Sequence, residues 1–176
     1  MLTSIILVLV VITGYAFAES SCKTTDGRYE VNVIGRNEHS EIIPEVIAFH
    51  AYISKDVHPG AGRRLVFDVT KTNKGNGYNS HTGVFTCPKT GIYVFVWVIR
   101  IYAGEHSTEL MINNYVYGST FLRAKNGDDG SVSGTVVAHV SKGDTVYVRN
   151  RSEYAGDGRI SSNVNGKPTF SGWLLQ

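Results

Sequence analysis

From residue 46 onward the chain consists of short apolar or alternating segments, separated by clusters of Gly, Asn, Asp and Ser. No ten-residue window has the 3.6-residue periodicity of an amphipathic helix. Alternation with a period of two is typical of β-strands, whose successive side chains face opposite sides of a sheet. The pattern predicts strands at 46–54, 65–70, 83–86, 91–103, 107–112, 115–117, 121–124, 132–140, 145–150, 160–163 and 169–175.

The strand expected at 91–103 departs from simple alternation, because residues 91–99 include no charged side chain. Tyr93, Phe95 and Trp97 point to one face of the sheet, and the residues between them point to the other. Those intervening residues are also apolar, so both faces are expected to be buried. Because a monomer would leave one row as an exposed apolar patch, the pattern predicts an oligomer.

The segments between the predicted strands carry residues that favour turns. Asn113 and Asn114 separate two apolar strands, and Asn tolerates the left-handed backbone of a tight hairpin. Residues 126–130 and 142–144 combine glycine with aspartate, and 73–80 is expected to be a longer polar loop. This spacing indicates an all-β domain of two packed antiparallel sheets, without the crossover helices of an α/β fold.

Residues 1–18 have the features of a secretory signal peptide, with an apolar core at 5–12 followed by a small-x-small cleavage sequence. A transmembrane anchor is the alternative, but it needs roughly 20 apolar residues. Cleavage would leave a polar leader at 19–44, which contains Cys22, and a globular domain at 45–176. We therefore expect a secreted, extracellular protein with no membrane span.

The charge of the chain argues against nucleic acid as a partner. The formal net charge is only +2, and the basic residues are scattered rather than clustered into a binding surface. A nucleic-acid-binding function is therefore not expected.

Two cysteines and one glycosylation sequon bear on a secreted chain. Cys22 is the candidate for an interchain disulfide, with an intrachain bond between Cys22 and Cys87 as the alternative. Cys87 follows an apolar strand, where a buried free thiol is the simpler expectation. Asn150 begins an Asn-Arg-Ser sequon and is a glycosylation candidate if it lies on an exposed turn; an unused sequon is the alternative.

Several short motifs occur in order from residue 47 to the C-terminus. They are Ala48-Phe49, then Asn73 with Gly75 and Tyr78, then Thr82-Gly83-x-Phe85-Thr86-x-Pro88-x-x-Gly91-x-Tyr93-x-Phe95, then Leu110-x-x-Asn113, then Val140-x-x-Gly143-Asp144-x-Val146-x-Val148, and finally Phe170-x-Gly172-x-Leu174-Leu175.

This series resembles the signature of the complement C1q globular domain. The resemblance implies a ten-stranded antiparallel jelly-roll sandwich, of the kind found in tumour necrosis factor ligands, assembled as a homotrimer. One apolar row of the strand at 91–103 would then fill the core and the other would face a neighbouring protomer. Aromatic residues expected in the core or at the trimer contact are Phe49, Phe85, Tyr93, Phe95, Trp97 and Phe170.

The leader shows no collagen repeat, so complement activation through a stalk-bound protease is not expected. The chain looks most like the secreted C1q-like lectins of invertebrates, which bind microbial polysaccharides, sialylated glycans or mannans. The resemblance therefore implies a trimeric pattern-recognition protein of innate immunity that binds carbohydrate. The alternative is a cytokine-like or matrix ligand that binds a host receptor through grooves between protomers.

No motif predicts an enzyme. The six histidines are dispersed, and neither a nucleophile elbow nor a phosphate-binding loop occurs. Asp128 and Asp129 lie in a glycine-containing loop, where carboxylates are candidate calcium ligands, although aspartates that form turns explain them equally well. No cofactor is required by the sequence, and calcium remains a candidate.

Ligand contacts are expected on loops, because the sheet faces are used for packing. An aromatic ring stacks on the apolar face of a sugar, and arginine binds a carboxylate with paired hydrogen bonds. A solvated loop and edge-strand packing are the simpler explanations for the residues that fit this description. The first candidate set is Arg151, Glu153, Tyr154, Asp157 and Arg159, and the second is Tyr102, Tyr115, Tyr117 and Arg123.

Overall fold

The computed structural model describes residues 18–25, 28–35 and 45–175, which belong to two units. In the first unit, β1 (Ala18–Thr25) pairs antiparallel with β2 (Arg28–Gly35), and Cys22 lies opposite Val31. Most of the predicted signal peptide, residues 1–17, lies outside the described residues. The side chain of Cys22 also lies outside this description, so its disulfide stays a prediction.

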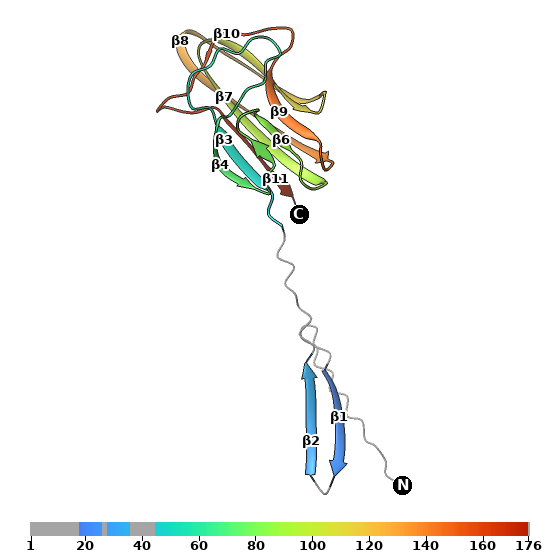
Figure 1. The fold of residues 1–176 in the computed structure, drawn as a ribbon. Coiled ribbons are helices and arrows are strands. Elements are labelled where there is room, and N and C mark those ends of the chain that lie inside the picture. Colours follow the sequence, from blue (N-terminus) through green and yellow to red (C-terminus); the bar gives the residue numbers. More distant parts are fainter. Residues whose placement is uncertain (1–17, 26–27, 36–44, 176) are drawn as a thin grey trace. The chain divides into compact units, whose positions relative to one another are not determined.

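The second unit is an antiparallel β-sandwich (Figure 1). Every element in its described residues is a strand, which confirms the all-β class predicted from the alternating pattern. The strands are β3 (Ala48–Tyr52), β4 (Val69–Lys74), β5 (Tyr78–Asn79), β6 (Val84–Thr86), β7 (Gly91–Ile112), β8 (Tyr115–Val140), β9 (Thr145–Asn150), β10 (Asp157–Ile160) and β11 (Thr169–Leu175).

Two long strands, β7 and β8, each run through both sheets. Their pairing shifts between Tyr102 and Gly104, where Ala103 adopts a φ of 50°. The sequence predicts breaks here, but a bulge lets each strand continue into the other sheet. In the first sheet the strand order is β4, β3, β11, the first half of β7 and the second half of β8. In the second sheet the order is the first half of β8, the second half of β7, β9, β6 and β5.

The aromatic row of β7 faces the core between the two sheets. The other aromatic residues predicted for the core or the trimer contact are buried as well. Trp97 lies at the centre, only 1% exposed, and its indole Nε1 donates a hydrogen bond to Thr108 Oγ1 at 3.0 Å. A Cβ on Gly134 would lie 2.2 Å from this indole, so only glycine leaves room for the ring.

The second row of β7 lies on the outer side of the first sheet and is partly exposed. Val94 pairs with Trp173 of β11 on one side and with Val137 of β8 on the other. Val137 is 62% exposed, and Trp173 is also exposed. We call this surface the apolar sheet face; its residues are Ile92, Val94, Val96, Val98, Val137, Trp173 and Leu175.

The sequence predicts a loop at 73–80, but this polar segment contains β5, which pairs with β6. The amide of Asn73 closes the free edge of β5. Its Oδ1 accepts from the backbone N–H of Tyr78 at 3.1 Å, and its Nδ2 donates to the Tyr78 carbonyl at 2.9 Å. A side chain that copies strand pairing in this way protects the edge from association with other strands.

Candidate functional site

Asn150 is the last residue of β9, and its side chain points inward. Val146 and Val148 are buried on the same side, as the period of two requires. Asn150 is 0% exposed, and its Nδ2 donates to the carbonyls of Pro59 and Ala155. Glycosylation of Asn150 would require an exposed turn, so its burial favours the alternative of an unused sequon. Instead, this amide anchors the loop at 151–156.

The loop at 151–156 places Tyr154 beside a cross-strand ion pair. Glu105 of β7 lies opposite Arg123 of β8, and Arg123 Nε donates to Glu105 Oε2 at 2.6 Å. The hydroxyl of Tyr154 donates to the other carboxylate oxygen, Oε1, at 3.0 Å. The structure thus joins one residue of each predicted ligand set through Glu105.

These contacts stabilise the ionised carboxylate. The hydrogen bond from Tyr154, and then the one from Arg123, hold the pKa of Glu105 below its usual range. The same contact raises the pKa of Tyr154, so its hydroxyl remains a donor. The arginine also lies over the ring of Phe121, with 5.7 Å between its Cζ and the ring centroid. We call Glu105, Phe121, Arg123 and Tyr154 the Glu105 cluster.

Two exposed aromatic rings give the Glu105 cluster an apolar contact surface. Tyr154 is 41% exposed and Phe121 is 56% exposed. Glu105 and Arg123 lie on the side of the second sheet that faces away from the core, because His106 and Ala124, which follow them, are buried. The apolar sheet face belongs to the first sheet, so the two surfaces lie on different sheets.

The remaining predicted ligand residues form other contacts or lie exposed. Arg151 Nη2 lies 2.9 Å from Glu153 Oε2 in an exposed pair. Arg159 lies over the ring of Tyr102 and pairs with Asp56 at 3.1 Å. Asp157 pairs with Glu105 in the register of β10 and β7, whereas Tyr115 and Tyr117 are exposed at the start of β8.

Glu105 is the residue that sequence reasoning missed. The apolar pattern predicts a break at 104–106, which would place Glu105 in a turn. In the structure it is a strand residue whose neighbours come from β8 and β10. Only the pairing register brings these side chains together, and a single sequence carries no direct signal of register.

His106 lies under the loop that carries Tyr154. Its ring is buried, and among the described residues its Nε2 has no hydrogen-bond partner. Its Nδ1 lies 3.4 Å from Asn150 Oδ1, and a Cβ on Gly156 would lie 2.2 Å from the same nitrogen. The loop therefore rests directly on this imidazole, and glycine at 156, with a φ of 84°, permits the approach.

Acid is expected to destabilise the domain through His106. Burial lowers its pKa from the ordinary value of 6.5, so the unfolded chain binds this proton more readily than the folded domain. The stabilisation is complete above about pH 6.5 and is lost as the pH falls below it. His106→Gln should therefore reduce the fall in melting temperature between about pH 7 and about pH 5. His81→Gln is the exposed control, and identical profiles for wild type and His106→Gln would contradict this role.

Asp129, one of the two predicted calcium ligands, is paired with an arginine. Asp129 Oδ2 lies 2.8 Å from Nη2 of the buried Arg100, whose Nη1 donates to Ser161 at 3.0 Å. Asp128 is exposed. Within the ranges that the structure describes, no three His, Cys, Asp or Glu side chains form a group suited to a metal. Arg100 supplies the positive charge beside Asp129, so this carboxylate already has a cationic partner.

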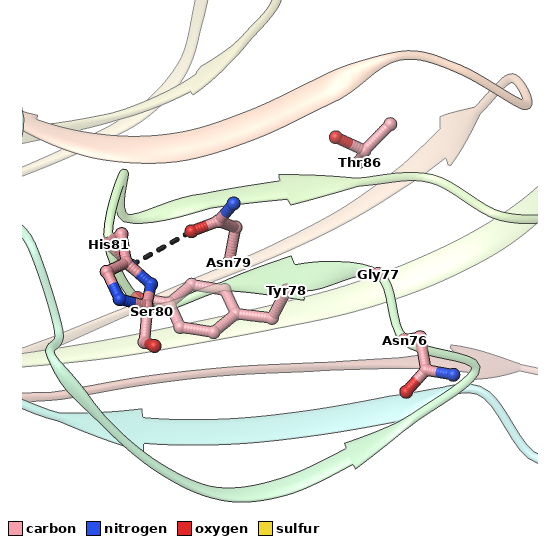
Figure 2. Close-up of a pocket in the computed structure, with 7 residues that line it drawn as sticks. All are labelled: Asn76, Gly77, Tyr78, Asn79, Ser80, His81 and Thr86. Carbon is pink, nitrogen blue, oxygen red and sulfur yellow. Dashed lines mark hydrogen bonds between the residues drawn. The ribbon is translucent and has the colours of Figure 1, made fainter.

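A pocket lies at β5, away from the Glu105 cluster (Figure 2). Its volume is about 380 Å³, and Asn79 Oδ1 accepts from the backbone N–H of His81 at 2.9 Å. The Tyr78 ring belongs to the core, where its hydroxyl donates to the Phe67 carbonyl. This pocket is polar and was not predicted; its lining residues are Asn76, Gly77, Tyr78, Asn79, Ser80, His81 and Thr86.

Cys87 is a free, buried thiol, as expected for a small apolar residue at the end of a strand. No helix in the described part of the chain has the length and apolar character needed to cross a bilayer.

The two five-stranded sheets and their connections define a jelly-roll domain of the C1q and tumour necrosis factor type. The model of the C1q domain family matches residues 48–175. The chain therefore belongs to the C1q domain family, which confirms the resemblance seen in the motifs. Domains of this type are generally ligand-binding modules without enzymatic activity.

Solved structures share the fold at low sequence identity. The globular domain of zebrafish complement 1qA protein has a TM-score of 0.62 and 19% identity, covering 74% of this chain and 98% of that one. Eiger TNF from S. frugiperda has a TM-score of 0.58 and 18% identity, covering 76% and 94%. Murine APRIL has a TM-score of 0.54 and 12% identity, covering 74% and 99%. These matches confirm the jelly roll.

Proposed function

We propose that this protein is a secreted, homotrimeric recognition protein that binds carbohydrates on microbial or other cell surfaces in innate immunity. The observation that carries the proposal is the Glu105 cluster. It combines two exposed aromatic rings with a fixed carboxylate–guanidinium pair on the outer side of the second sheet. Aromatic faces and directional hydrogen-bonding groups are the two elements that sugar recognition requires.

The apolar sheet face supports the trimer. Trp173, Val137 and Ile92 form part of a contiguous exposed apolar surface, of a kind that monomeric proteins rarely leave open to water. Burying the apolar sheet face against further copies of the chain would remove the free-energy cost of exposing it to water. The Glu105 cluster lies on the other sheet, so burial of the apolar sheet face leaves the proposed ligand site available.

A trimer would present several copies of a site that binds only weakly by itself. Each protomer would present one shallow cluster, and a surface that repeats the same sugar would engage several at once. Avidity of this kind suits recognition of polysaccharides and dense glycans better than recognition of single free sugars.

The proposal is tested by a glycan array and whole-bacteria binding with the purified trimer, with and without calcium. Arg151→Ala and Tyr154→Ala are expected to weaken binding about tenfold with little change in melting temperature, because both side chains are exposed. Lys142→Ala, at the exposed turn between β8 and β9, is the control. No binding to any glycan or bacterium would sink the proposal.

A cytokine-like or matrix ligand is the second candidate. Its support is the shared fold with Eiger TNF and murine APRIL, together with the exposed aromatic residues at the start of β8. A saturable receptor on host cells, bound equally well in the presence of simple sugars, would favour this candidate. Competition by sugars would argue for carbohydrate binding instead.

A further inference from the structure

The arginines around the proposed ligand site are paired with carboxylates. Arg123 pairs with Glu105 at 2.6 Å, and Arg151 pairs with Glu153 at 2.9 Å. Arg159, on the adjacent β10, pairs with Asp56 at 3.1 Å. Lys125 is a further cation that acts on Glu105, and Asp157 is a further carboxylate that acts on Tyr154, so the positive and negative groups around the site are equal in number.

This balance disfavours anionic sugars. A sialic acid carboxylate that approached Arg123 would also approach Glu105, and the repulsion would offset most of the attraction. Because Arg123 Nε is paired with Glu105 Oε2, a second carboxylate bound to the same guanidinium would lie near that negative charge. Tyr154 is committed to Glu105 as well, since its hydroxyl donates to Oε1.

The same arrangement suits sugar hydroxyls. A neutral hydroxyl both donates and accepts, so it can bond to Glu105 and Arg123 together without disturbing their pair. Among the described residues, Arg123 uses only Nε in hydrogen bonding, which leaves its terminal amino groups for a ligand. Phe121 and Tyr154 supply exposed rings beside these polar groups for the apolar face of a pyranose.

The Tyr154 ring is held in place before a ligand arrives. Its loop is anchored by the buried Asn150 amide, and its hydroxyl is bonded to Glu105. A contact surface that is already ordered loses less conformational entropy on binding. A shallow site of this kind therefore gains affinity from its rigidity.

We infer that the Glu105 cluster binds neutral pyranose polysaccharides and does not bind sialylated glycans. This inference rests on the proposed function and specifies its ligand class. It also assigns Glu105 as a ligand-binding residue, with Tyr154 and Phe121 as the stacking rings.

The test compares immobilised mannan with a sialyllactose conjugate, using the full secreted protein at low and high salt. Mannan binding should be retained at high salt, because it involves no net charge neutralisation, and sialyllactose binding should be absent. Binding to sialyllactose alone, or loss of binding at high salt, would overturn the neutral-ligand inference while leaving carbohydrate binding intact. Absence of binding to both, and to the glycan array, would overturn the proposed function as well.

Variants test the location of the site. Glu105→Gln is expected to weaken mannan binding about tenfold, since it loses the ionised acceptor but keeps the shape of the side chain. Tyr154→Phe keeps the ring and loses the bond to Glu105, so its affinity should fall between those of wild type and Tyr154→Ala. Glu45→Gln makes the same chemical change at an exposed residue outside the cluster. Wild-type mannan binding by folded Glu105→Gln and Tyr154→Ala would place the site elsewhere.

Discussion

Val96→Lys is expected to convert the proposed trimer into a folded monomer. Val96 lies in the outer row of β7, between Ser171 of β11 and Thr135 of β8, and its side chain is half-buried. In a monomer the lysine can extend its charged end into water, so the fold survives. Within a contact between protomers the same charge would be buried without a partner, at a cost of several kcal/mol.

Light scattering and thermal melting distinguish these outcomes. Val96→Lys should have the mass of a single chain. It should still unfold cooperatively, with the melting temperature of a monomer that lacks the contacts between protomers. Val164→Lys, in a fully exposed loop position, is the matched control and should remain a trimer. A wild-type protein that is a monodisperse monomer would refute the assembly.

Trp97→Lys, one residue further along β7, is expected to prevent folding altogether. Truncating a buried tryptophan costs about 3–5 kcal/mol, and an unpaired buried ammonium adds to this cost. Domains of this size have a total stability of about 5–15 kcal/mol. The change would also leave Thr108 without the indole donor and would leave empty the space that Gly134 provides.

Recovery of soluble protein and circular dichroism check this prediction. Trp97→Phe is the milder comparison, because it keeps an aromatic ring in the core and loses only the hydrogen bond and part of the volume. It should fold with a lowered melting temperature. A Trp97→Lys protein that melts like the wild type would show that this row is not the core.

The candidate site was only partly accessible from the sequence. Tyr154 and Arg123 stood out because loop aromatics and arginines suit sugar binding, and the structure joins them through Glu105. Glu105 could not be identified, since its partners are set by strand register across β7, β8 and β10. The sequon left the exposure of Asn150 open, because it does not reveal whether the last residue of a strand points inward.

The sequence by itself determined the β-strand pattern, the family and the two apolar rows of residues 91–99. It did so because a period of two in hydrophobicity follows directly from strand geometry. Only the tertiary structure decided that Tyr93, Phe95 and Trp97 face the core, while Val94 and Val96 remain partly exposed. Two equally apolar rows are indistinguishable until the packing shows that Gly134 of the adjacent strand leaves room for Trp97 and that Thr108 of the opposing sheet accepts its hydrogen bond.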